Sequence, residues 1–254
     1  MYNQSLHDGT IPAGWKQSHI TPVHKGGTCD DPSNYRPISV VPILAKVLEK
    51  IVSIQFSQYL EKNNLLHPHQ GAFHCGKSTE DILLLAVDHI VNTLDVGKSV
   101  CTAFLDLKKA FDSLDHCILL QRIGDLGVTG SVLRWFKNYL SGRVHRVKLH
   151  NQFSEWREMK GGILQGSALG PLLFLIYMNN LPLQITDGLL VQYADDTTLV
   201  CSGSTPSAAA AVLNSQLKLV HNWIWNGKMS LNYNKPSVMW FKTKSKKCLE
   251  HSKF

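Results

Sequence analysis

The sequence predicts an α+β fold, and a β-hairpin pattern around two adjacent acids is the main observation behind this prediction. Two β-prone apolar runs flank Asp195 and Asp196 within residues 191–200, which predicts a strand, a tight turn and a return strand. A buried strand is also predicted over residues 100–107, with helical patterns before and after it. Because neighbouring strand side chains point to opposite faces, both acids are expected in the turn itself, where Asp is also common for purely conformational reasons.

Apolar periodicity and turn residues place the remaining elements along the chain. Residues 1–37 are turn-rich, and Gly26-Gly27 and Asp31-Pro32 within them predict a loop. Ser78 and the acids after it are typical of a helix N-terminus, and Gly97 is expected to end that helix. The other predictions are helices over residues 42–63, 109–123, 132–140, 167–179 and 207–225, a hairpin over 144–159, and a last pair of short strands over 229–241.

Composition places the 254-residue chain among globular proteins, because 44% of its residues are apolar and only 18% are charged. This length can bury a substantial core, as one large domain or one and a half. Lys and Arg exceed Asp and Glu by 26 − 19 = 7. The resulting pI near 9.1 indicates a polyanionic partner.

Cysteine usage and hydropathy exclude several classes of protein. The six cysteines include no Cys-x-x-Cys pair, so neither a zinc ribbon nor a disulfide framework is indicated, and free thiols are expected. The N-terminal residues lack the apolar segment of a secretory signal. The most apolar stretch, residues 169–183, is too short and too interrupted to span a bilayer. We therefore expect an intracellular, soluble protein with no membrane partner.

A third acid, Asp106, ends the buried strand and is a candidate partner for the two acids of the hairpin. If the strand lies beside the hairpin, Asp106 faces Asp195 with Asp196 close by, and three carboxylates repel one another unless cations neutralise them. Oxygen ligands with no His or Cys nearby favour magnesium over zinc. Two such ions, roughly 3.5–4 Å apart, stabilise in-line phosphoryl transfer. The alternative for Asp106 is a helix N-cap.

Five segments stand in a fixed order along the chain: Asn34-Tyr35-Arg36-Pro37-Ile38-Ser39, then Asp106 with Ala110-Phe111-Asp112, then residues 162–171, then Tyr193-Ala194-Asp195-Asp196, and finally residues 223–235. Together they resemble the successive motifs of reverse transcriptases, in particular those of non-LTR (LINE-like) retrotransposons. The resemblance runs from about residue 6 to residue 241. Five ordered motifs are far more specific than any one of them.

The resemblance implies a right-hand polymerase core of fingers and palm, with an antiparallel palm sheet backed by helices. Residues 1–98 would form the fingers and the finger–palm helices, and residues 99–241 the palm. Residues 242–254 would be a basic tail at the start of a thumb that is largely absent, which weakens the hold on a primer-template because that hold comes mostly from phosphate contacts. The lysines of this tail fit either a nuclear address, as the family implies, or a solvated end.

The resemblance also assigns metal and catalytic roles. Asp106, Asp195 and Asp196 would hold two Mg²⁺ ions, with the Leu107 carbonyl as a further ligand and Mn²⁺ as an alternative metal. Lys235 occupies the position of a lysine near the leaving pyrophosphate, which makes it a candidate general acid.

The implied nucleotide-binding residues each have a simpler alternative. Phe111 would exclude a 2′-hydroxyl, although a Phe is often plain core. Gln165 and Gly166 would line the nucleotide pocket, where a glycine permits close approach, although a Gly-rich helix lead-in needs no ligand. Lys25 and Arg36 would bind the triphosphate as cations, although exposed basic residues are often merely solvated. Tyr193 would lie under the primer end, although an aromatic residue on a strand can be ordinary core.

Four positions depart from the family pattern. In the segment that resembles Gln-x-Gly-Phe-Arg, Ala72 replaces the Gly and His74 replaces the Arg, and a largely neutral histidine cannot supply a guanidinium fork. Leu164 stands where a Pro is usual, and Pro236 replaces a Thr and removes a backbone donor.

These observations predict an RNA-directed DNA polymerase. It would add deoxynucleotides from their triphosphates to a DNA primer 3′-OH on an RNA template, by two-magnesium phosphoryl transfer. The alternative is a catalytically inert, thumb-less nucleic-acid-binding remnant of a retrotransposon. A metal-dependent phosphodiesterase that uses the same acids would leave Phe111 and Gln165 without a role.

Overall fold

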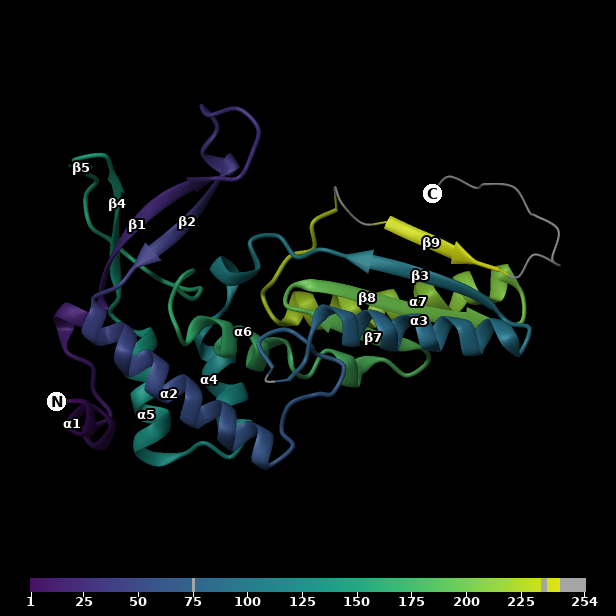
Figure 1. Cartoon of the computed structure of the whole chain (residues 1–254), viewed down its shortest axis with the longest axis horizontal. Helices are drawn as coiled ribbons and strands as arrows, with labels where there is room; N and C mark the ends of the chain where they lie inside the picture. Colours follow the sequence, from purple (N-terminus) through teal and green to yellow (C-terminus); the bar gives the residue numbers. More distant parts are fainter. Residues whose placement is uncertain (75, 234–236, 243–254) are drawn as a thin grey trace. The chain divides into compact units, whose positions relative to one another are not determined.

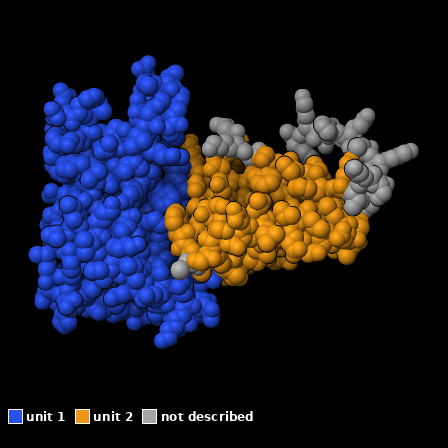
Figure 2. Space-filling view, viewed as in Figure 1, with its two compact units in different colours: residues 1–66, 109–178 blue, residues 67–108, 179–254 orange. Residues whose placement is uncertain are grey.

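The computed structural model describes residues 1–74, 76–233 and 237–242, which fold as two units that each combine two separate stretches of chain (Figure 2). Unit 1 comprises Met1–Leu66 and Lys109–Met178, and unit 2 comprises His67–Lys108 and Asn179–Phe254. Neither unit follows the expected division at residue 98. That division into fingers and palm therefore stays a prediction about function.

A four-stranded antiparallel sheet forms the centre of unit 2, with the strand order β7-β8-β3-β9 (Figure 1). Its strands are β3 (Ser99–Leu105), β7 (Leu189–Tyr193), β8 (Asp196–Gly203) and β9 (Ser237–Phe241). Two helices, α3 (Thr79–Asp95) and α7 (Pro206–Asn226), pack against it, and a short 3₁₀ turn η4 (Pro182–Gln184) precedes β7. The predicted antiparallel sheet backed by helices is thus confirmed.

Local capping signals fix where the two helices of unit 2 begin. Ser78 and Asp81 form a reciprocal capping box at the start of α3, as the sequence predicts. Thr205 caps α7 by accepting from the backbone N–H of Ala208. The apolar face of α3 then packs on the sheet through a cluster of buried side chains: Ile82, Ala86, Ile90, Val100, Leu189, Val191 and Val200.

A mixed sheet organises unit 1, with the order β2-β1-β4-β5 and β6 paired to β4 (Figure 1). β1 and β2 are antiparallel, whereas β1 and β4 are parallel although far apart in sequence. The strands are β1 (Gln17–His24), β2 (Tyr35–Val40), β4 (Val144–Leu149), β5 (Gln152–Phe153) and β6 (Arg157–Glu158). The loop predicted at Gly26-Gly27 and Asp31-Pro32 lies between β1 and β2, whereas the strands on either side of it were not predicted.

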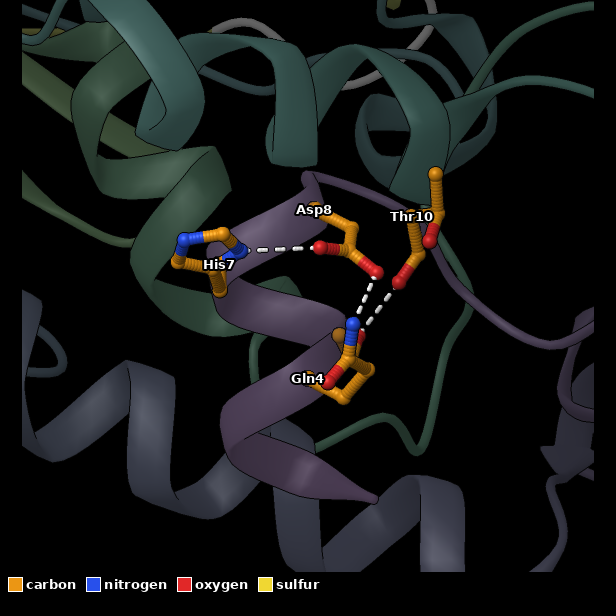
Figure 3. A network of polar contacts seen from close by, with 5 residues as sticks. Gln4, His7, Asp8 and Thr10 are labelled. Atoms are coloured by element: carbon orange, nitrogen blue, oxygen red, sulfur yellow. Dashed lines mark hydrogen bonds and ion pairs between the residues drawn. The ribbon is translucent and has the colours of Figure 1, made fainter.

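Helices make up the rest of unit 1: α1 (Tyr2–Asp8), α2 (Ile43–Lys62), α4 (His116–Asp125), α5 (Gly130–Leu140) and α6 (Gly170–Met178), with 3₁₀ turns η1 (Ala13–Lys16), η2 (Pro32–Asn34) and η3 (Ala110–Ser113). α6 is apolar on every face and is almost wholly buried, as expected of a helix at the centre of a core. At the end of α1 the Asp8 carboxylate accepts a hydrogen bond from Gln4 and pairs with His7, so both contacts lie within this short helix (Figure 3).

Three predicted boundaries are corrected by local chemistry. The single helix expected over residues 109–123 is divided into η3 and α4, because Lys109 is left-handed (φ 49°) and Asp115 caps α4. α6 begins at Gly170, whose N–H donates to the Ser167 side chain 2.8 Å away. In the last predicted pair of strands, Leu231 forms a single bridge and residues 234–236 lie outside the described residues.

The described cysteines, Cys29, Cys101, Cys117 and Cys201, are free, as expected. No helix in the described part of the chain is long and apolar enough to cross a membrane.

Candidate functional site

Strand register in unit 2 brings the three predicted acids to one end of the sheet. β3 and β8 pair as far as Leu105 and Thr197, so the next rung sets Asp106 opposite Asp196. Residues opposite each other in an antiparallel pair have Cβ atoms about 4.5–5.5 Å apart. Asp195 immediately precedes Asp196, in the hairpin turn. The register thus produces a grouping of carboxylates at adjacent strand ends, but Asp196, and not Asp195 as predicted, lies opposite Asp106.

The turn itself differs from the expectation that both acids occupy it. Tyr193 pairs with Asp196, so Asp196 is the first residue of β8 and only Ala194 and Asp195 form the turn. Ala194 is left-handed, with φ 55°. Two-residue hairpin turns with positive φ at their first residue suit the twist of the flanking strands. As a result the two acids differ in setting, one on the turn and one on the strand.

Asn232 holds Asp106 in place, a contact that sequence reasoning missed. Its Nδ2 donates to Asp106 Oδ2 over 2.8 Å, and its backbone N–H donates to the Asp106 carbonyl over 2.9 Å. Lys108 N–H donates to the Ser230 carbonyl over 2.8 Å. This backbone hydrogen bond and the one from Asn232 to Asp106 lie on either side of the Leu107–Leu231 bridge, and neither uses the Leu107 carbonyl. Asn232 belongs to the last of the five motif segments, residues 223–235, but only the fold shows that its partner is Asp106.

The donor set at this end of the sheet suits a hard cation, since it consists of carboxylates and one backbone carbonyl. Among the described residues, no three His, Cys, Asp or Glu side chains are grouped closely enough to hold a metal ion. One oxygen of Asp106 accepts a hydrogen bond from Asn232. The residue types therefore fit magnesium, while the side chains are not drawn together around a single point.

Segment 69–71 is tied to the strand that precedes the acids. Gln192 N–H donates to the His69 carbonyl over 2.8 Å, and Gly71 N–H donates to the Gln192 carbonyl over 3.0 Å. A Cβ on Gly71 would lie 2.3 Å from Ile82, so only glycine lets α3 pack this closely. Tyr193 is half-buried against the same α3 cluster, which agrees with its alternative interpretation as core.

In unit 1, Phe111 and Gln165 are both held by neighbouring side chains. The Phe111 ring stacks on the buried ring of Phe174 with centroids 4.6 Å apart and planes 13° apart, and Phe111 itself is half-buried. Gln165 Nε2 donates to Asp112 Oδ1 over 3.0 Å. Ile163 N–H donates to the Phe111 carbonyl over 2.8 Å, which ties the two segments together.

The loop that carries Gln165 and Gly166 lies directly against β2. Ser39 N–H donates to the Gln165 carbonyl over 2.7 Å. Gly166 has φ +99°, and a Cβ there would lie 3.1 Å from the Ser39 carbonyl oxygen and 3.3 Å from Ile38 Cγ2. The close approach that this glycine permits is therefore that of the β2 backbone. Its proposed contact with a nucleotide stays a prediction.

Glu49 is a second residue that sequence reasoning missed. It is 2% exposed, and its two oxygens accept from Tyr139 Oη (2.9 Å) and from the backbone N–H of Ala168 (2.8 Å). Burial, followed by the nearby Glu49 carboxylate, raises the pKa of Tyr139. Arg143 donates to the Tyr139 carbonyl over 2.9 Å. Glu49 thus fixes the start of the segment that leads from Gln165 into α6.

Lys25 and Arg36 lie on the β1–β2 hairpin and are exposed. Arg36 pairs with Val23, and the Lys25 N–H donates to the Asn34 carbonyl over 2.9 Å, which continues the ladder by one rung. Residues two apart on a strand share a face, so the register sets both cations on the same face of the hairpin. Lys235 and Pro236 lie outside the described residues.

An antiparallel sheet with acids at the ends of β3 and of the β7–β8 hairpin, and with helices packed on it, defines the palm class of nucleic-acid polymerases. Residues 23–249 match the family described as "Reverse transcriptase (RNA-dependent DNA polymerase)". This chain belongs to the reverse transcriptase family, which confirms the resemblance seen in its motifs.

Relatives and solved structures agree with this membership. The chain is 31% identical over 244 residues to the probable RNA-directed DNA polymerase from transposon BS of Drosophila melanogaster, covering 92% of the chain and 27% of the relative. It is 26% identical over 256 residues to the RNA-directed DNA polymerase from mobile element jockey of the same species, covering 98% of the chain and 28% of that relative. The chain thus spans about a quarter of the length of these curated relatives.

The fold resembles apo telomerase from Candida tropicalis, with a TM-score of 0.66 and 13% identity, over 93% of this chain and 52% of that one. This likeness concerns the fold alone. The α+β fold predicted from the sequence is confirmed.

Proposed function

We propose that this chain is the fingers and palm part of an RNA-directed DNA polymerase. A DNA primer 3′-OH would attack the α-phosphorus of a deoxynucleoside triphosphate opposite an RNA template, and pyrophosphate would leave. The observation that carries the proposal is the β3–β8 register, which sets Asp106 opposite Asp196 beside the turn that holds Asp195. Family membership and relatives named RNA-directed DNA polymerase support it.

Asp106, Asp195 and Asp196, with the Leu107 carbonyl, would hold two Mg²⁺ ions, or Mn²⁺ as the alternative. When bound, such ions neutralise charge on the attacking and leaving oxygens. The chain's own contribution is to keep Asp106 in position through Asn232, and to set Asp195 on a turn whose conformation the β7–β8 pairing fixes.

The residues of unit 1 would select and hold the nucleotide. Phe111, braced by Phe174, would occupy the space of a 2′-hydroxyl and so favour deoxynucleotides. Gln165, oriented by Asp112, would contact the nucleotide beside Gly166. Lys25 and Arg36 would bind the triphosphate, and Arg can do so through two parallel hydrogen bonds.

Two proposed roles complete the reaction. Tyr193 would lie under the primer end, held against the α3 cluster. Lys235 would give a proton to the leaving pyrophosphate. We also propose that the sheet with Lys25 and Arg36 acts as fingers and that the sheet with Asp106 acts as palm.

Primer extension on an RNA template tests the proposal. The wild-type chain should extend the primer with magnesium and deoxynucleotides, whereas Asp195→Asn should not, because an amide is a far weaker magnesium ligand than a carboxylate. Asp95→Asn, an exposed acid at the end of α3, is the matched control and should extend normally. Equal background signal from all three proteins that still bind RNA would favour the inert nucleic-acid-binding remnant instead.

A further inference from the structure

Aromatic rings and cations gather on the β4–β5 hairpin of unit 1, a region to which no role has been assigned. Arg146 Cζ lies 4.0 Å from the ring centroid of Phe153 and 4.5 Å from that of Trp156. The His19 ring lies 5.3 Å and 5.6 Å from the same two rings. Lys148 Nζ is 5.7 Å from Phe153. These five residues are called the ring platform below.

Strand register sets four members of the ring platform on one face of the mixed sheet, whose strands are drawn in Figure 1, and Trp156 joins them through its contacts with Arg146 and His19. His19 pairs with Arg146 across β1 and β4, and Lys148 pairs with Phe153 across β4 and β5. Paired residues share a face, and residues two apart on a strand share it too.

The same register carries this face across to β2. His19, and Val23 four residues further along β1, share a face, and Val23 pairs with Arg36. The ring platform and the proposed triphosphate cation Arg36 are therefore on one face. Ile38, two residues from Arg36, is on it as well and would be 3.3 Å from a Cβ on Gly166.

The ring platform is open to a ligand. Phe153 is 46% exposed and Trp156 is 39% exposed, far more than rings that serve only as core. Burial lowers the pKa of His19, and the positive charges of Arg146 and Lys148 lower it further. Such positive charge around the rings suits an anionic ligand. Glu158, an acid on this face, pairs with Val144 at the opposite end of β4 from Lys148.

Exposed rings interleaved with cations are what single-stranded nucleic acids bind. Bases stack on aromatic rings and on guanidinium planes, while lysine and arginine contact the phosphates. A base pair in a duplex hides its faces from such stacking. The chemistry of the ring platform therefore favours an unpaired strand over a duplex.

We propose that the ring platform binds the unpaired template strand that has not yet been copied, through base stacking on Phe153 and Trp156 and phosphate contacts to Arg146 and Lys148. This inference rests on the proposed polymerase function, because that function requires an unpaired template next to the nucleotide. The template would bind on the β4–β5 hairpin of unit 1.

The sheet geometry gives the reach of this surface. Arg36 on β2 and Phe153 on β5 are three strand spacings of about 4.8 Å apart and about two residues of roughly 3.3 Å offset, hence roughly 16 Å apart. At about 3.4 Å per stacked nucleotide this distance corresponds to about five nucleotides. A template overhang of one nucleotide is too short to reach the rings, whereas one of six can reach them.

The experiment compares the affinity of RNA–DNA primer-templates whose RNA overhang is one or six nucleotides long, by fluorescence anisotropy without nucleotide or divalent ion. Wild type should bind the long overhang more tightly by about 5- to 150-fold for each stacked base. Phe153→Leu/Trp156→Leu should lose most of this gain, because only the phosphate contacts to Arg146 and Lys148 remain. Phe153→Tyr/Trp156→Phe, which keeps two rings, should recover the gain. A gain of undiminished size in the Leu double variant overturns the proposal.

Two controls separate stacking from other effects. Trp225→Leu removes a ring that is 73% exposed on α7 and should leave the gain unchanged. Pairing the six-nucleotide overhang with a complementary strand should reduce the gain to the part that phosphate contacts supply. An equal gain with the paired overhang would mean phosphate contacts alone and would overturn the stacking. A DNA overhang should give the same gain as RNA, because stacking reads the base and not the 2′-hydroxyl.

Failure of this inference and failure of the polymerase proposal give different results. A chain that shows the overhang gain but adds no nucleotide supports the ring platform and contradicts the proposed catalysis. A chain that extends primers, and whose overhang gain is the same with and without the two rings, retains the catalysis and loses the ring platform.

Discussion

Replacing Glu49 by Leu should destabilise the protein, because it removes both acceptors of a buried network. Tyr139 Oη and Ala168 N–H would each lose a partner, and an unsatisfied buried donor costs about 1–3 kcal/mol, giving about 2–6 kcal/mol together. Leu has nearly the same volume, so a cavity adds little. Urea unfolding should show a lower midpoint with an unchanged slope.

A double variant isolates the hydrogen bond between the two side chains. Tyr139→Phe removes the hydroxyl that Glu49→Leu leaves unsatisfied, so the two losses should be less than additive by about 0.5–3 kcal/mol. Lys50→Leu, an exposed change on the same helix, should alter stability by less than about 0.5 kcal/mol. A loss below about 1 kcal/mol in Glu49→Leu, with additive effects in the double variant, would refute a network that depends on this carboxylate.

The network also has a functional consequence. Ala168 follows Gln165 by three residues, and Glu49 anchors its backbone. Glu49→Gln keeps one acceptor oxygen but sets an amide donor against a second donor, so it should weaken this anchor. The expected result is a higher KM for deoxynucleotide with a smaller change in kcat, measured by primer extension. A change confined to kcat would mean that the anchor does not act through nucleotide binding.

Three further outcomes are expected. Phe111→Val should raise ribonucleotide incorporation relative to deoxynucleotide, and an unchanged ratio would mean that Phe111 is only core. Asn232→Leu should lower extension by about 10- to 100-fold, because Asp106 loses its 2.8 Å hydrogen-bond donor. Losing a group that orients a metal ligand usually has an effect of this size. A matching loss of thermal stability would mean that the effect is structural. Burial lowers the pKa of His67 to about 4. Stability should therefore fall as pH falls from about 6.5 to 4, because the unfolded chain binds the proton first. His67→Asn should make the urea midpoint depend less on pH, and the same pH dependence in wild type and variant would refute this.

Local chemistry made part of the fold readable from sequence. The capping box of Ser78 and Asp81 specifies the start of α3, because both hydrogen bonds form within one turn of helix. The alternating apolar pattern around Asp195 specifies a hairpin for the same local reason. Where the local signal was ambiguous, as at Lys109 with its left-handed backbone, one continuous helix was predicted and two elements formed.

Long-range pairings were beyond this reasoning. β1 and β4 pair in parallel although some 127 residues separate His19 from Arg146, and the ring platform exists only because of that pairing. The strands on either side of the predicted loop at residues 26–32 could not be predicted for a related reason. β1 is completed by β4, far along the chain, and strand propensity depends on such context.

The sequence by itself determined the family, and it predicts the three acids and the class of metal that their oxygens suit, because residue type and motif order carry that information. Only the tertiary structure decided how those acids are held. The register of β3 and β8 sets Asp106 opposite Asp196, and Asn232, 126 residues away, supplies the hydrogen bond that orients Asp106. Register and buried polar contacts depend on which distant segments pack together, and packing is a property of the whole folded chain.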